Sequence, residues 1–148
     1  MFGSEFNLFG TIHLITIAVI IIVSVFLPNF YKNKYDGQKS LMAKFVAIVI
    51  AAHVIISPIK DLYIIEPPYD WRETLPLHMC DISEIFLVWF FLGGPRILYT
   101  CAFFWGLSGA AMAILTPDVP YHDLDYIFFM IGHGMIVVGI MYATIALG

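Results

Sequence analysis

The sequence LPLHMCDISE, residues 75–84, leads directly into IFLVWFFLGG, residues 85–94, which contains no charged side chain. The second stretch predicts a membrane helix, and the first places reactive or ionisable side chains in its opening turns, namely His78, Cys80, Asp81, Ser83 and Glu84. A charged side chain in a membrane span costs about 2.5 to 3.5 kcal/mol at mid-bilayer and less near an interface. Such side chains usually face the interior of a helix bundle, so we expect function to lie here.

The composition predicts a polytopic membrane protein. Of 148 residues, 61% are hydrophobic and only 12% are charged, and soluble domains typically carry about 25% charged residues. The first residues lack the basic region of a signal peptide, so we expect the first helix to remain in the protein. A net charge of −4 with few Lys and Arg gives no basic patch, which argues against nucleic acid as a partner. The expected partners are membrane lipids, with a membrane protein or a second copy of the chain as further options.

A membrane helix needs about 20 apolar residues, and the chain divides into five such segments. We predict an all-α, single-domain bundle over residues 1–148, with transmembrane helices at about 8–27, 41–57, 76–93, 97–115 and 125–147. Pro28 is expected to close the first helix, and Pro58 to kink or end the second. Pro76 suits the first turn of the third helix, and Gly93-Gly94-Pro95 suits its end.

The loops predict the orientation of the bundle. The connections after the first and third segments are basic, with Lys32, Lys34, Lys39 and Arg96, whereas the other two connections are mainly acidic. The positive-inside rule therefore predicts an external N-terminus and a cytoplasmic C-terminus. At about 1.5 Å per residue, His13, His53, His78 and His133 then share the outer half of the bundle with Cys80. His122, in an acidic outer loop, is expected to face water.

Cys80 is the candidate nucleophile. Helical spacing places it on one face with Ser83 and Glu84, and His78 and Asp81 share the neighbouring face. A helix N-terminus and a nearby imidazole both favour a thiolate, which is what a nucleophilic cysteine needs. The alternative is that Cys80 is a small buried hydrophobe and that the carboxylates only cap the helix.

The other polar side chains allow structural and functional interpretations alike. His133 lies between Gly132 and Gly134, whose missing side chains leave room for a substrate chain or for a tightly packed neighbour. His13 and His53 are weaker candidates for the site, and Trp105 is a candidate interfacial or groove-lining aromatic. Asp118, after Pro117, would orient a histidine or simply end a helix in water. A ridge of small residues, Gly106, Gly109, Ala110 and Ala113, predicts close helix packing.

Three segments together resemble a known family. The run LPLHMCD at 75–81, the run FWGLSG at 104–109 leading to LTPD at 115–118, and the pair His133-Gly134 resemble the bacterial YwaF-like integral membrane proteins, which are related to the transmembrane protein 164 family. Phe9-Gly10 with His13 is similar to that family's first helix. The resemblance implies a bacterial inner-membrane protein, and for the eukaryotic relatives an intramembrane acyltransferase acting on ether phospholipids. Family members usually continue past the fifth helix, so we expect a truncated or minimal member.

The resemblance leads to one main hypothesis, a thiol-dependent lipid acyltransferase or hydrolase. Cys80 would attack an acyl ester, His133 or His78 would act as the base, and Asp118 or Asp81 would orient the imidazole. His13, His53, Glu84 and Trp105 are the expected substrate-binding residues. No cofactor is expected.

Two alternatives stay open. The first is a non-catalytic membrane subunit, in which the polar residues lock helices together or contact a partner. The second is a haem or metal site, since histidines on several helices lie at one depth. No tight ligand spacing supports the second alternative.

Overall fold

The computed structural model describes residues 3–64 and 78–148, with side chains at 3–60 and 78–148. Its helices are α1 (Thr11–Lys32), α2 (Asp36–Ile64), α4 (Met79–Phe91), α5 (Arg96–Leu115) and α6 (Leu124–Tyr142), with a final π-helical segment η1 (Ala143–Leu147). Two short strands, β1 (Ser4–Glu5) and β2 (Tyr121–His122), pair antiparallel and join the N-terminal segment to the loop before α6. The predicted helical architecture is thus confirmed, with this small ribbon as an addition.

Four of these helical segments are long and apolar enough to cross a membrane: Thr11–Lys32, Asp36–Lys60, Arg96–Leu115 and Leu124–Leu147. In a bilayer every backbone N–H and C=O must be paired within the protein, and a helix achieves this within one segment. The described part of α4 has 13 residues, a rise of about 20 Å against a hydrocarbon core of about 30 Å. The five-span prediction is therefore supported for four spans.

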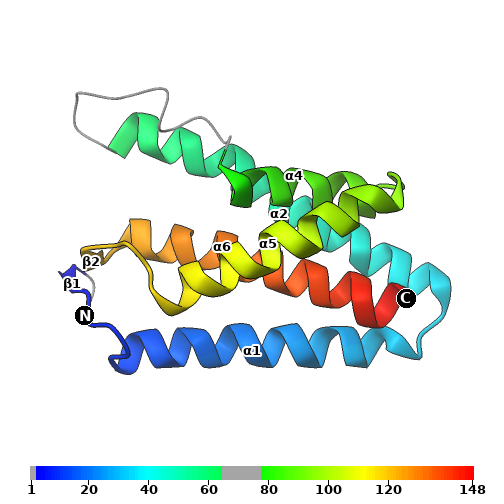
Figure 1. Cartoon of the computed structure of the whole chain (residues 1–148), viewed down its shortest axis with the longest axis horizontal. Coiled ribbons are helices and arrows are strands. Elements are labelled where there is room, and N and C mark those ends of the chain that lie inside the picture. The colour runs from blue at the N-terminus through cyan, green and yellow to red at the C-terminus, as the bar shows by residue number, and fades with distance from the viewer. Residues whose placement is uncertain (1–2, 65–77) are drawn as a thin grey trace.

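Successive helices run in alternating directions, and the two chain ends lie at opposite ends of the bundle (Figure 1). We call the end that holds β1, β2 and the starts of α4 and α6 the N-terminal end. The other end carries the starts of α2 and α5, where the basic residues Lys32, Lys34, Lys39 and Arg96 occur. The basic residues thus gather at one end of the bundle, as the orientation prediction requires. Which end faces the cytoplasm stays a prediction.

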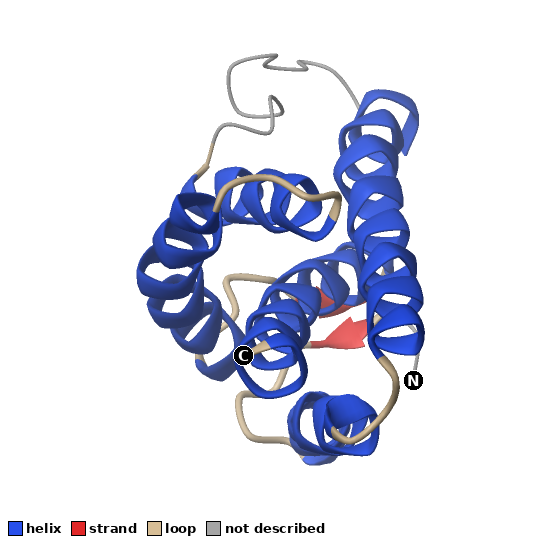
Figure 2. Cartoon of the chain, turned by 90° about the vertical axis from the view of Figure 1, so that its right-hand side faces the viewer, coloured by secondary structure: helices blue, strands red, loops and turns tan. Residues whose placement is uncertain are grey.

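Helix α6 is the centre of the bundle and packs against α1, α2, α4 and α5 (Figure 2). Its glycines allow this, because small residues let membrane helices approach closely. A Cβ on Gly134 would lie 3.1 Å from Ile20 of α1, and one on Gly139 would lie 3.2 Å from Leu87 of α4.

Pro28 lies inside α1, so the prediction that it closes the first helix is wrong. Pro58 lies inside α2 and does not end it, so a kink at Pro58 stays a prediction. Membrane helices tolerate proline inside a span. The glycine prediction at the end of α4 is right. Gly93 has φ +102 and its N–H donates to the Phe90 carbonyl, which turns the chain into α5. Pro76 lies outside the described residues.

The small-residue ridge of α5 packs as predicted. Gly106 faces both neighbouring helices: a Cβ there would lie 2.8 Å from Ile136 of α6 and 3.0 Å from Ser83 of α4. Ala110, one turn further along, is fully buried.

Gly106→Ala is therefore expected to lower the free energy of unfolding by about 1–3 kcal/mol, because α4 or α6 must move to admit the methyl group. Gly37→Ala in the first turn of α2 is the control, since no atom lies within 4 Å of a Cβ there. Unfolding in detergent micelles measures both variants. Equal stabilities would contradict the close packing at Gly106.

Candidate functional site

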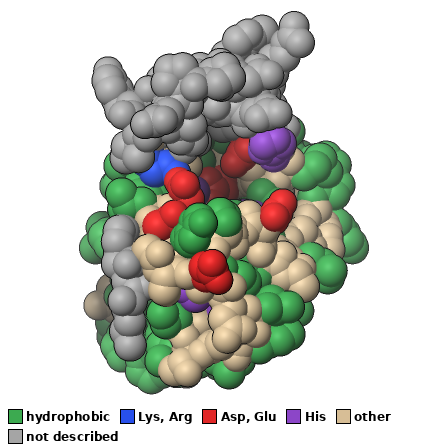
Figure 3. Space-filling view, turned by 90° about the vertical axis from the view of Figure 1, so that its left-hand side faces the viewer, with side chains coloured by type: hydrophobic (Ala, Val, Ile, Leu, Met, Phe, Trp, Pro, Cys, Tyr) green, Lys and Arg blue, Asp and Glu red, His purple; other side chains and the backbone are tan. Residues whose placement is uncertain are grey.

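A cavity of about 340 Å³ opens among α2, α4 and α6 at the N-terminal end. Acidic side chains gather on this face of the molecule around a hollow (Figure 3). The cavity wall mixes polar and aromatic side chains: His53, Ser57, His78, Cys80, Asp81, Glu84, Phe128, Phe129, Gly132, His133 and Ile136. Most of the predicted site residues are thus brought together from three helices.

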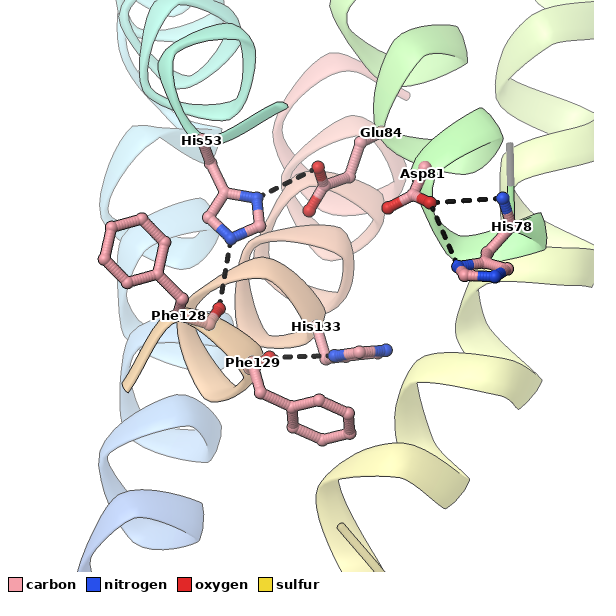
Figure 4. Close-up of polar contacts among 7 residues, drawn as sticks. All are labelled: His53, His78, Asp81, Glu84, Phe128, Phe129 and His133. Carbon is pink, nitrogen blue, oxygen red and sulfur yellow. Dashed lines mark hydrogen bonds and ion pairs between the residues drawn. The ribbon is translucent and has the colours of Figure 1, made fainter. Parts of the chain in front are cut away.

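His53 links three helices through both of its ring nitrogens (Figure 4). Its Nε2 lies 3.0 Å from the Phe128 carbonyl of α6, and its Nδ1 lies 3.1 Å from Glu84 Oε2 of α4. A carbonyl oxygen only accepts, so Nε2 carries the proton and donates. The Nδ1–Oε2 contact then holds one further proton, either on a neutral carboxyl group or on an imidazolium.

Gly132 is what allows this contact. A Cβ at that position would lie 2.3 Å from His53 Cε1 and 3.1 Å from Glu84 Oε1. We expected the glycines beside His133 to leave room either for a substrate or for a neighbour, and the neighbour is found. The space at Gly132 holds the His53–Glu84 pair, and the space at Gly134 holds Ile20.

His133 presents an unprotonated nitrogen when its ring is neutral. Its Nδ1 donates to the Phe129 carbonyl at 2.8 Å, and its ring rests against the Phe129 ring with centroids 4.3 Å apart. The proton on Nδ1 leaves a lone pair on Nε2. The imidazole extends away from the Phe129 carbonyl to the side on which His78 lies (Figure 4).

Asp81 caps the start of α4. Its Oδ2 accepts from the His78 backbone N–H at 3.1 Å and lies 3.6 Å from His78 Nδ1. Asp81 therefore caps the helix, as the structural alternative expects, and it also lines the cavity. Its imidazole partner is His78 at the exposed mouth of the cavity rather than His133.

Cys80 is half-buried on the cavity wall, and its Sγ lies 3.4 Å from the position of a Cβ on Gly109 of α5. Glu84 lies one turn away on the same helix face. Negative charge on Asp81 or Glu84 opposes a thiolate, whereas the N-terminus of α4 favours one. A base from another helix is therefore the group that would activate this thiol.

Three predicted site residues lie away from the cavity. His13 is fully buried, with Nδ1 accepting from the Phe9 N–H at 3.1 Å and Nε2 donating to the Ile114 carbonyl at 2.8 Å, so it ties the start of α1 to the end of α5. Trp105 is 42% exposed and contacts Phe86. Asp118 is exposed in the loop after α5.

The expectation that His122 faces water is wrong. It is 8% exposed, its Nδ1 lies 3.3 Å from Ser4 Oγ, and its ring packs against Phe6 and Tyr126. The β1–β2 pairing draws the loop inward and buries the ring.

The described residues contain no group of three His, Cys, Asp or Glu side chains placed to hold a metal ion. The haem or metal alternative therefore receives no support from this part of the chain. Cys80 and Cys101 are both free thiols.

A family model described as the TMEM164 family matches residues 8–148. The chain belongs to the TMEM164 family. This match confirms the relationship predicted from the motifs around Cys80 and His133, and with the apolar helices it makes the chain a member of a membrane protein family. No curated protein and no solved structure matches the chain.

Several residues of the cavity wall were not predicted from the sequence of this TMEM164-family member. Ser57, Phe128, Phe129 and Ile136 line the wall, and Gly132 makes room for the His53–Glu84 pair. One signal was available: a lone histidine and a lone glutamate at similar depth in neighbouring apolar helices need each other as partners.

A double-mutant cycle tests the fit at Gly132. Gly132→Ala is expected to destabilise the protein by about 1–3 kcal/mol, because its methyl group displaces the His53 ring. In a His53→Ala background the same change should cost less, since the ring is gone. Gly134→Ala is the matched control because its methyl group meets Ile20, so its cost should be equal in both backgrounds. Additive costs for Gly132→Ala and His53→Ala would contradict the contact.

Proposed function

We propose that this protein transfers acyl chains between membrane lipids, with Cys80 as the nucleophile and His133 as the general base. The observation that carries the proposal is the shared cavity, which both residues line from different helices within one apolar bundle. A nucleophile, a base with a free nitrogen and an apolar wall are the parts that acyl transfer needs.

In the first half-reaction the Cys80 thiol gives its proton to His133 Nε2, and the sulfur attacks the carbonyl carbon of a lipid ester. The carbon–oxygen bond to the glycerol part breaks, and the His133 imidazolium returns the proton to the departing oxygen. The product is an acyl thioester on Cys80 and a lysolipid. The backbone hydrogen bond from Nδ1 to Phe129 suits this role, because it fixes the tautomer that leaves Nε2 free.

In the second half-reaction a hydroxyl group gives its proton to His133 Nε2 and attacks the thioester. The carbon–sulfur bond breaks, and the proton returns to the Cys80 sulfur. A lipid hydroxyl in this step makes the protein a transferase, and water makes it a hydrolase. Phe128, Phe129 and Ile136 supply the apolar part of the cavity wall that an acyl chain requires.

His78 and Asp81 have a secondary place in this proposal. Their contact lies at the mouth of the cavity, where the His78 side chain is 73% exposed. An exposed pair suits the polar headgroup of a lipid better than its ester. His133 is the preferred base because it is more deeply set and its tautomer is fixed.

Cys80→Ala is expected to abolish thioester labelling by a phospholipid that carries an alkyne-tagged acyl chain, measured on purified protein in liposomes. Cys101→Ala is the matched control, because Cys101 does not line the cavity and should leave labelling intact. His133→Gln should slow labelling about 10²–10⁴-fold, the usual contribution of a general base. Unchanged labelling of Cys80→Ala, or a wild-type protein that never labels and purifies with a stoichiometric partner, would favour the non-catalytic subunit instead.

A further inference from the structure

We infer that the His53–Glu84 pair binds the hydroxyl group of the acyl-accepting lipid. This inference rests on the proposed function and adds the acceptor subsite to it. The starting point is one atom, Glu84 Oε1. Glu84 is 2% exposed, yet only its Oε2 has a hydrogen-bond partner among the described residues, namely His53 Nδ1.

Oε1 has access to the cavity. Glu84 is one of the lining residues. In the described part of the chain the fully enclosed polar side-chain atoms without a partner are Ser24 Oγ and His122 Nε2, so Oε1 keeps some accessible surface. A polar atom in such a water-poor setting is costly while it lacks a partner, by about 1–3 kcal/mol. A ligand that supplies a hydrogen-bond donor would remove that cost.

Oε1 accepts a hydrogen bond in either charge state of the pair. Because His53 Nε2 donates to the Phe128 carbonyl, the proton between the two side chains lies on Oε2 or on Nδ1. In the first state Oε1 is the carbonyl oxygen of a neutral acid, and in the second it belongs to a carboxylate. Neither state places a proton on Oε1, so the site selects a donor.

This selectivity separates the two substrates. The ester group of an acyl donor offers only acceptor oxygens, so it gains nothing from Oε1. A lysolipid offers a free hydroxyl group, whose O–H can donate to Oε1. The cavity of about 340 Å³ also exceeds the roughly 30 Å³ share of one water molecule, so a glycerol group can enter with its hydroxyl.

The pair is held rigidly enough to act as a binding site. His53 is anchored on the backbone of α6, its ring stacks on Phe128 with centroids 6.0 Å apart, and Gly132 lets it lie against that helix. Glu84 and Cys80 lie one turn apart on α4, so a hydroxyl group on Oε1 is held on the same helix face as the thioester.

A binding experiment without turnover tests the inference. Cys80→Ala protein in detergent is titrated with a lysophosphatidylethanolamine that has a free glycerol hydroxyl, and with the analogue in which hydrogen replaces that hydroxyl. The hydroxyl compound is expected to bind about 3- to 10-fold more tightly, as one hydrogen bond allows. Equal affinity of the two compounds would overturn the inference and would assign Oε1 to water.

Two substitutions at Glu84 sharpen the result. Glu84→Gln keeps an oxygen acceptor towards the cavity while its amide donates to His53 Nδ1, so the preference for the hydroxyl compound should persist. Glu84→Met removes the acceptor, so the preference should disappear. Glu5→Gln, an exposed carboxylate at the same end, should leave the preference unchanged. A preference that survives in Glu84→Met would also overturn the inference.

The outcome can be separated from that of the proposed function. Failure of the proposed function appears as loss of the thioester on Cys80, which the binding titration does not require. If Glu84→Met does not fold, the two compounds still give a result on Cys80→Ala protein alone.

Discussion

The requirement that buried polar groups find partners inside the bundle governs this structure. A bilayer offers no water to His53 or Glu84, so each must pair with the other or with the backbone. His53 does both, because one ring nitrogen reaches Glu84 on α4 and the other reaches the Phe128 carbonyl on α6. The pair therefore joins α2, α4 and α6 at the depth where the cavity opens, and Gly132 is the residue that makes the approach possible.

The backbone of the central helix α6 anchors two of the three histidines on the cavity wall, His53 and His133. His53 is anchored on the Phe128 carbonyl and His133 on the next carbonyl, that of Phe129. The anchoring atoms differ, because His53 uses Nε2 and His133 uses Nδ1. Within the described part of the chain, both ring nitrogens of His53 are hydrogen-bonded, whereas only Nδ1 of His133 is. One fold thus separates a histidine that holds a partner from a histidine that can take a proton.

The length of the apolar segments predicted the helical architecture. The family motifs contain His78, Cys80, Asp81 and His133 of the cavity wall, and helical spacing places Glu84 on the face of Cys80. The pairing of His53 with Glu84 could not be predicted, because it depends on how α2, α4 and α6 pack together. Depth estimates from the sequence place residues along a helix but do not say which helices are neighbours. The burial of His122 depended on a short strand pair that no periodicity announces. The helix ends expected at Pro28 and Pro58 did not occur, because a helix in an apolar segment can continue through proline.

The central claim is that Cys80 and residue 133 face one cavity, and thiol cross-linking tests it most directly. In a Cys101→Ala background, H133C and D118C each add one thiol at the N-terminal end of the bundle, and only position 133 lies on the cavity wall. A short bifunctional thiol reagent is expected to join Cys80 to the thiol of H133C and to leave the thiol of D118C unlinked. Cross-linking of D118C but not of H133C would contradict the account.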